Sequence, residues 1–295
     1  MPFRPSPLRL AGLAGAAGSL AAAAGLCWLS LRWVRPQRVR LDVPVGGPLS
    51  EAWFPSADGV PLYGWLLDAG PGAPAVVCCH GYTRSIEETF PLAYELFERG
   101  FTALAFDFRG CGRSGGRFTS LGYHEAKDVL GAVAYVQART GAARVGVHGI
   151  SMGGAAAITA AAGCEAIACV VADSAFATLD ACVACRLAGV RPLLRPLYGL
   201  SKWSAELLVR VRSRDVRPAD HVARLAPRPL LLIHGTADTV VPFQESVELL
   251  RRAGPSAELW AVPDGEHAMA RFRHREAYLE RVTAFLRAHL APLPA

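Results

Sequence analysis

The stretch Gly149-Ile150-Ser151-Met152-Gly153-Gly154 decides how the rest of the chain is interpreted. It follows a short apolar run at 144–148 and precedes an alanine-rich, helix-favouring run at 155–162. A strand, a tight turn and a helix around G-x-S-x-G are typical of a nucleophile elbow. Gly149 and Gly153 carry no Cβ, so strand and helix can approach closely, and the helix start directs its free N–H groups at charge near Ser151. The alternative is a glycine-rich turn that contains an incidental serine.

Around this stretch, apolar strand patterns alternate with amphipathic helix patterns. An antiparallel hairpin is predicted over 51–67, with its turn at Ser56-Ala57-Asp58-Gly59. Further strands are predicted at 75–79, 101–106, 144–148, 166–171, 229–233 and 258–262. Helices are predicted at 86–98, 125–139, 242–252 and 271–290. This alternation indicates an α/β protein with a mostly parallel, eight-stranded sheet covered by helices on both faces.

One segment, residues 174–224, breaks the alternation. It separates two predicted strands and is far longer than an ordinary connection between a strand and a helix. Its leucine and aromatic residues stand among arginines. We therefore predict a small helical cap over the strand ends, and the alternative is an insertion that only packs against the domain.

The composition limits the classes of function. The chain has 295 residues, 52% of them hydrophobic, and a formal net charge of +6. No basic stripe is interleaved with aromatic residues, so a nucleic-acid partner is not expected. The eight cysteines do not resemble a disulfide framework, since Cys78 and Cys79 are adjacent in a strand and would point to opposite faces. Cys182 and Cys185 form a C-x-x-C without a second pair, and no metal-ligand cluster or dinucleotide fingerprint is present, so we expect no metal and no cofactor.

The N-terminal region contains an uncharged run, Leu10 to Leu31. Its roughly 22 residues would span about 33 Å as a helix, enough for a bilayer core. Residues 1–36 are therefore predicted to be a single-pass membrane anchor with a basic flank, and residues 37–295 the catalytic domain. The arginines after the run favour a cytoplasmic location for that domain. The alternative is a secretory signal cleaved near Ala21 to Gly25, which would place the domain in the periplasm or outside the cell.

Five motifs together resemble those of the α/β-hydrolase superfamily, over nearly all of the chain past residue 40. They are His80-Gly81-Tyr82, the run from Asp107 to Gly115, Gly149-x-Ser151-x-Gly153, the run from His234 to Pro242, and Gly265-Glu266-His267. The order Ser, Asp, His is the one that this superfamily uses. The chain is most similar to the serine-aminopeptidase-like, Bem46-like branch of small esterases and lipases.

The resemblance implies a role for each motif. Ser151 would be the nucleophile, His267 the general base and acid, and Asp238 the group that orients the imidazole. The backbone N–H groups of Tyr82 and Met152 would form the oxyanion hole. Asp173, at the end of the strand after the elbow, is the rival for the acid.

Three other histidines are available as the base. His80 and His148 are interpreted as structural, and His274 is disfavoured because it lies inside the closing helix. Asp107 and Arg109 are expected to brace their own glycine-rich turn.

The function implied is that of a serine hydrolase acting on carboxylic esters, lipid esters and thioesters included, through an acyl-enzyme intermediate. The alternatives are a serine peptidase or amidase, which would use the same triad, and a non-catalytic binding protein of the same fold. The sequence leaves the substrate and the oligomeric state open.

Overall fold

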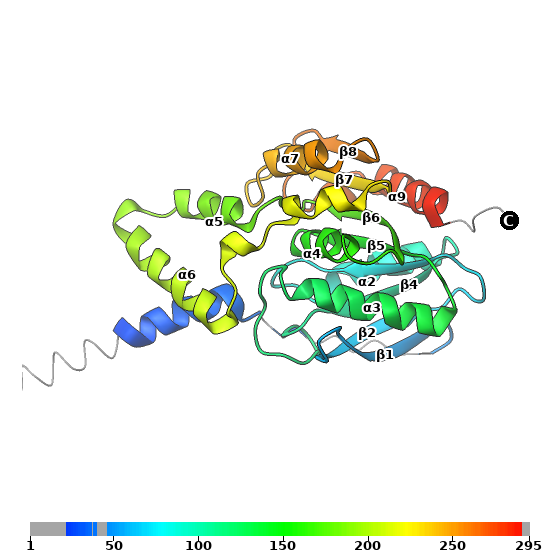
Figure 1. Cartoon of the computed structure of the whole chain (residues 1–295), viewed down its shortest axis with the longest axis horizontal. Coiled ribbons are helices and arrows are strands. Elements are labelled where there is room, and N and C mark those ends of the chain that lie inside the picture. Colours follow the sequence, from blue (N-terminus) through cyan, green and yellow to red (C-terminus); the bar gives the residue numbers. More distant parts are fainter. Residues whose placement is uncertain (1–21, 37, 40–45, 291–295) are drawn as a thin grey trace, which may run out of the picture.

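The computed structural model describes residues 22–36, 38–39 and 46–290, and an eight-stranded sheet runs through its centre (Figure 1). The strand order is β1-β2-β4-β3-β5-β6-β7-β8. The first three strands in this order pair antiparallel and the rest parallel, which confirms the predicted fold class and its entry hairpin. The strands are β1 (Leu49–Pro55), β2 (Pro61–Leu67), β3 (Ala75–Cys79), β4 (Thr102–Asp107), β5 (Val145–Ile150), β6 (Ile167–Asp173), β7 (Leu230–Gly235) and β8 (Ala257–Val262).

Helices cover both faces of the sheet. One face packs against α3 (Glu125–Thr140), α4 (Met152–Ala161) and α7 (Gln244–Ala253). The other packs against α2 (Ile86–Phe97), α8 (Ala270–Arg273) and α9 (Arg275–Leu290). The alternation of β3 divides its side chains between two cores, so Cys79 lies in the first and Cys78 in the second, on opposite faces as predicted. All eight cysteines are free.

The closing helix differs from the prediction, because it is split into α8 and α9 at His274. His274 leaves helical geometry, with φ −129° and ψ 48°. Arg271 and Arg275, one on each side of the break, both form ion pairs with the buried carboxylate of Glu95 on α2, at 3.0 and 2.6 Å. Both guanidinium groups thus reach the same carboxylate, a contact between segments that periodicity does not reveal.

The cap lies between β6 and β7 and consists mainly of α5 (Leu179–Ala188) and α6 (Arg195–Val209). Short 3-10 turns complete it: η1 (Pro192–Leu194), η2 (Ser213–Asp215), η3 (Pro218–Asp220) and η4 (Val222–Leu225). Figure 1 shows that the cap extends to one side of the sheet, with a helix of residues 22–34, in blue, beside α6.

This N-terminal helix contacts the folded domain. The indole Nε1 of Trp33 donates to Ser201 Oγ on α6 at 3.1 Å, and its ring packs edge-on against Tyr198 at 6.4 Å between centroids. Val34 is only 2% exposed, and its carbonyl accepts the N–H of Thr119 at 2.8 Å. The end of the helix is therefore part of the packed structure, while the division of the chain at residue 36 stays a prediction.

The predicted membrane anchor has no support in the structure. Residues 1–21, which include about half of the uncharged run, lie outside the described residues. Within the residues that are described, no helix combines the length and the apolar character needed to cross a bilayer.

Candidate active site

Ser151 lies at the junction of β5 and α4, in a backbone conformation that side-chain-bearing residues rarely adopt. Its φ is 52° and its ψ −114°. A Cβ on Gly149 would collide with the backbone of Gly153, and a Cβ on Gly153 would collide with the carbonyl oxygens of Cys79 and His80. The two glycines are thus required by close backbone approach on both sides of the serine, as expected for an elbow that presents its hydroxyl above the sheet.

The structure brings Ser151, His267 and Asp238 together, although 116 residues separate the first two. His267 Nε2 lies 3.1 Å from Ser151 Oγ, and His267 Nδ1 lies 2.6 Å from Asp238 Oδ2. Each side chain follows a different strand: Ser151 follows β5, Asp238 follows β7 and His267 follows β8. Because these strands are parallel, their carboxyl ends share one edge of the sheet, where the three side chains meet.

Asp238 is held by more than the histidine that it faces. Its Oδ1 accepts the backbone N–H groups of Val240 and Val241, both at 2.8 Å. Burial would raise the pKa of its carboxyl, but hydrogen bonds from His234 and His267 outweigh burial and hold that pKa well below its usual range. Hydrogen-bond donors therefore engage both carboxylate oxygens of Asp238. The group is ionised and can stabilise a positive charge on His267.

His234 is a supporting residue that the sequence analysis did not single out. It is fully buried, and its Nε2 lies 3.0 Å from the Val241 carbonyl and 3.3 Å from Asp238 Oδ2. Both neighbours of Nε2 are acceptors, so this nitrogen carries the proton, and Nδ1 accepts from the Ser246 hydroxyl. The sequence gives one indication of this supporting role: His234 stands four residues before Asp238, in the motif that contains the acid.

Asp173, the rival acid, does not contact His267. It is buried, and it accepts hydrogen bonds from the hydroxyls of Ser174 at 2.9 Å and Tyr278 at 3.0 Å. Ser174 Oγ in turn accepts the N–H of Ala268, next to His267, at 3.0 Å. Asp173 therefore supports the histidine loop through Ser174 and does not face the imidazole.

His148 belongs to the same buried group of side chains. Its Nε2 lies 2.7 Å from the Tyr278 hydroxyl, and that hydroxyl donates its own proton to Asp173. Burial lowers the pKa of His148 to about 3, so the ring is neutral at physiological pH. Its position agrees with the structural role expected for it.

The predicted oxyanion residues lie on either side of Ser151. Met152 begins α4, and Tyr82 follows a loop whose Gly81 comes close enough that an added Cβ would lie 3.7 Å from the Ser151 Cβ. Within the described chain, neither the Tyr82 nor the Met152 N–H donates to a protein acceptor. Both are thus available for a developing negative charge near Ser151.

The loop before Tyr82 is fixed at three points. The Gly81 N–H donates to Glu88 Oε2 at 2.6 Å. His80 accepts the Phe108 N–H through Nε2 at 3.0 Å and lies 2.7 Å from the Gly81 carbonyl through Nδ1. With both nitrogens engaged in backbone contacts, His80 holds the loop in place.

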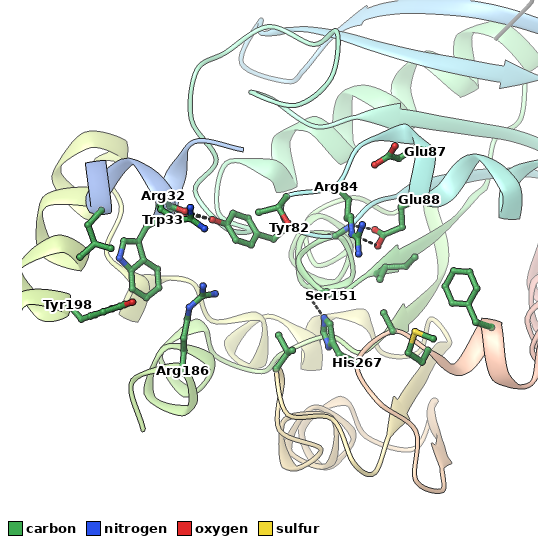
Figure 2. A pocket seen from close by; sticks show the side chains of 18 residues that line it. Arg32, Trp33, Tyr82, Arg84, Glu87, Glu88, Ser151, Arg186, Tyr198 and His267 are labelled. Carbon is green, nitrogen blue, oxygen red and sulfur yellow. Dashed lines mark hydrogen bonds and ion pairs between the residues drawn. The ribbon is translucent and has the colours of Figure 1, made fainter. Parts of the chain in front are cut away.

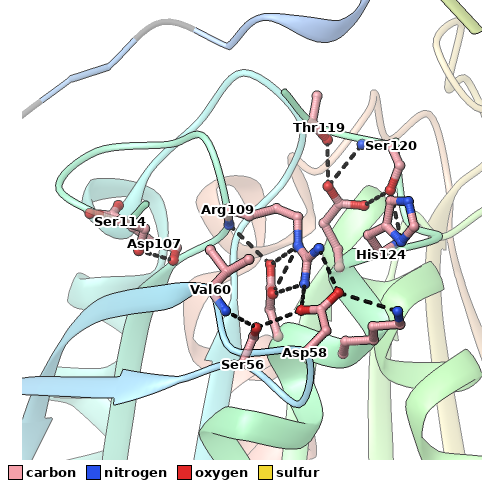
Figure 3. A network of polar contacts seen from close by, with 12 residues as sticks. Ser56, Asp58, Val60, Asp107, Arg109, Ser114, Thr119, Ser120 and His124 are labelled. Atoms are coloured by element: carbon pink, nitrogen blue, oxygen red, sulfur yellow. Dashed lines mark hydrogen bonds and ion pairs between the residues drawn. The ribbon is translucent and has the colours of Figure 1, made fainter. Parts of the chain in front are cut away.

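A second polar network braces the turn after β4 (Figure 3). Arg109 forms ion pairs with Asp58 at 2.7 Å and Asp128 at 2.6 Å, and it holds the pKa of Asp58 well below its usual range. Asp107 accepts the N–H groups of Ile86 and Arg113 at 2.8 and 3.0 Å. Asp107 and Arg109 are therefore structural, as expected from the sequence.

A cavity of about 840 Å³ opens above Ser151 and His267 (Figure 2). A second, mainly apolar pocket of about 210 Å³ adjoins it beneath the cap and shares Ser151 and Tyr82 as lining residues. Apolar side chains from the elbow and the cap line the smaller pocket, among them Met152, Phe176, Leu179 and Val183. Such a combination of an open cavity and an apolar recess beside one hydroxyl suits a small organic substrate.

The sequence analysis missed one wall of this cavity. Leu29, Arg32 and Trp33 line it from the N-terminal helix, and the Tyr82 hydroxyl donates to the carbonyl of Arg32 at 2.8 Å. No motif marks these residues, because their contacts join segments far apart in the chain. In the ranges that the structure covers, no cluster of three or more His, Cys, Asp or Glu side chains is placed to hold a metal ion.

Comparison with known proteins places the chain among hydrolases. Residues 88–292 match the model of the prolyl oligopeptidase family. The YqkD protein of Bacillus subtilis is 30% identical over 79% of this chain and 77% of its own length. The YfhR protein of Escherichia coli K12 is 32% identical, with 81% of both chains covered.

Among solved structures, the esterase Pf2001 of Pyrococcus furiosus superposes with a TM-score of 0.71. It is 30% identical, and the match covers 87% of this chain and 98% of the esterase. The hydrolase GrgF from Penicillium, at 21% identity and a TM-score of 0.69, shares the fold.

Proposed function

We propose that the protein is a serine esterase. The premise is that the chain belongs to the prolyl oligopeptidase family of the α/β-hydrolases and is a hydrolase of that type. The observation that carries the proposal is the pair of hydrogen bonds that connects Ser151 to His267 at 3.1 Å and His267 to Asp238 at 2.6 Å. A serine hydroxyl is a weak nucleophile by itself, and this arrangement gives it a base that is already oriented.

In the first half of the reaction, His267 Nε2 takes the proton of Ser151 as Oγ attacks the ester carbonyl. The imidazolium then lies against the ionised Asp238, and the Tyr82 and Met152 N–H groups receive the oxyanion. Collapse of the tetrahedral intermediate breaks the bond to the alcohol, which leaves with the proton from His267. Water repeats the sequence on the acyl-enzyme, releases the acid and restores Ser151.

Similarity to the Pyrococcus furiosus esterase over most of both chains supports an ester as the substrate. The match to the prolyl oligopeptidase family favours a second candidate, hydrolysis of a peptide or other amide. Both reactions use the same three side chains, and they differ in the leaving group that must be protonated.

Two measurements test the proposal. A fluorophosphonate probe should label the protein, and Ser151→Ala should abolish the labelling while the fold is retained. Turnover of 4-nitrophenyl butyrate should exceed that of alanine and proline 4-nitroanilides. Faster cleavage of an anilide would make the protein a peptidase, and absence of labelling would leave a non-catalytic binding protein.

A further inference from the structure

Three segments that are distant in the sequence line one side of the cavity above Ser151. They are the N-terminal helix with Arg32 and Trp33, the loop with Tyr82, and the cap with Arg186 and Tyr198. Figure 2 shows Arg32, Trp33, Arg186 and Tyr198 together on one side of Ser151. Two positive side chains from separate segments therefore occupy one end of the cavity.

Aromatic side chains hold this end in shape. The Arg186 guanidinium carbon lies over the Trp33 ring, 5.4 Å from its centroid, a distance typical of cation–π contacts. Trp33 is fixed to α6 through Ser201, and the Tyr82 hydroxyl donates to the carbonyls of Arg32 and Trp33 at 2.8 and 3.1 Å. Burial raises the pKa of Tyr82, and the positive charges of Arg186 and Arg32 both oppose that rise.

Two carboxylates, Glu87 and Glu88, also line the cavity, on another side of Ser151 from Arg32 and Arg186 (Figure 2). Glu88 is engaged by the Gly81 N–H at 2.6 Å and by Arg84 at 3.5 Å. Neither Arg32 nor Arg186 forms an ion pair with any carboxylate among the residues that the structure describes. The guanidinium donors of these two arginines remain available to a ligand, and such a planar group binds carboxylate or phosphate oxygens in pairs.

We propose that Arg32 and Arg186 form an anion subsite, so that the substrate is an ester with an apolar segment and a negatively charged group away from the scissile bond. The inference rests on the proposed function, whose substrate class it narrows. The apolar pocket of about 210 Å³ shares Trp33, Tyr82 and Arg186 with the larger cavity, so an apolar segment placed there would lie beside the arginines.

Matched pairs of esters test the subsite and show which part of the substrate carries the charge. Monomethyl suberate against methyl octanoate places a carboxylate on the acyl part. The octanoate ester of 4-hydroxybenzoate against phenyl octanoate places it on the alcohol part. The variants are Arg32→Gln, Arg186→Gln and the double variant, with Arg191→Gln, an arginine of the cap that does not line the cavity, as the control.

One anionic ester should react with a higher kcat/KM than its neutral partner. Each single variant should reduce that preference roughly fivefold, since an exposed ion pair contributes modestly. The same variants should lose less activity on the neutral esters than on the anionic one, and Arg191→Gln should change neither by more than about twofold. Equal losses for charged and neutral esters, or no preference for either anionic ester in the unmodified protein, would overturn the subsite.

A binding measurement keeps the subsite testable if none of the four esters is cleaved, an outcome that would count against the proposed function alone. Calorimetry with suberate and with octyl phosphate should give saturable binding to the Ser151→Ala protein. The binding should weaken when Arg32→Gln and Arg186→Gln are added to that protein. The tighter of the two ligands identifies the anion as carboxylate or phosphate. Binding that is absent, or equal in both backgrounds, would refute the subsite.

Discussion

The sheet edge that carries Ser151 and the outer wall of the cavity are built in different ways. At the sheet edge, each side chain follows a strand of the sheet, and backbone contacts fix two of the three: the elbow glycines around Ser151, and two N–H groups on Asp238. At the outer wall, side chains from the N-terminal helix and the cap contact one another and leave their polar ends facing the cavity. We therefore expect the first region to determine whether the protein reacts and the second to determine what it accepts.

The most severe test of this comparison is Ser151→Ala. Removal of the hydroxyl should lower kcat for an ester by about 10⁶-fold, leaving a residual rate of 10³–10⁴ over water from the oxyanion hole and binding. The folded state should be unaffected, because the side chain lies partly exposed at a turn. Ester hydrolysis by the purified variant near the original rate would show that the nucleophile lies elsewhere.

Asp238→Asn and Asp173→Asn separate the acid from its rival. In Asp238→Asn, Oδ1 can still accept the Val240 and Val241 N–H groups, which turns the amide N–H₂ toward His267 and favours the wrong tautomer. The expected loss in kcat is about 10⁴-fold. Asp173→Asn should cost far less, since it acts only through Ser174. A larger loss from Asp173→Asn would exchange the two roles.

The outer wall is tested by two truncations. Removal of residues 1–36 deletes Arg32 and Trp33 from the cavity and frees the Tyr82 hydroxyl, so kcat/KM for esters should fall by roughly 10- to 100-fold through misplacement of the substrate. Removal of residues 1–21 leaves the described helix intact and should leave kcat/KM within about twofold.

Both truncated proteins should retain fluorophosphonate labelling of Ser151, because the hydrogen bonds among Ser151, His267 and Asp238 involve no residue of the deleted segment. If removal of residues 1–36 changed neither labelling nor kcat/KM, the N-terminal helix would have no part in the site.

The smallest expected effect concerns the buried support of the sheet edge. The pKa of His148 is about 3 in the fold and about 6.5 when the chain is unfolded, so the unfolded state binds a proton first as the pH falls. The stability contributed by the neutral ring is therefore complete above pH 6.5 and is lost progressively toward pH 3, by about 2 kcal/mol between pH 6.5 and pH 5. Urea unfolding at both pH values gives the free energy of unfolding of the original protein and of His148→Gln. An equal change of that free energy with pH in the two proteins would contradict the prediction.

The same division explains what the sequence reveals. Ser151, Asp238 and His267 could be placed from the sequence because each motif marks a strand end, and parallel strands bring their ends to one edge whatever their separation in the chain. Trp33 and Ser201 are 168 residues apart, and no regular pairing of backbones connects them. Their contact depends on side-chain packing between a helix and a cap, which has no signature in periodicity or motif.

His234 and the break at His274 lie between these two cases, because part of each feature could be predicted from the sequence and part could not. His234 stood in a motif that was already identified, but its role follows only from the acceptors around its ring, Val241 and Asp238. On either side of the break in the closing helix, Arg271 and Arg275 form ion pairs with Glu95 on a distant helix. In both places the backbone element was predictable and the polar partner was not.

The N-terminal helix also matters for how such a protein could diversify. The cavity takes one wall from a segment that contributes no strand to the sheet and no side chain to the pair of hydrogen bonds at Ser151. Mutations at Leu29 or Arg32 are therefore expected to alter substrate choice with little effect on core stability, and exchange of residues 22–32 between relatives is a route to new specificities.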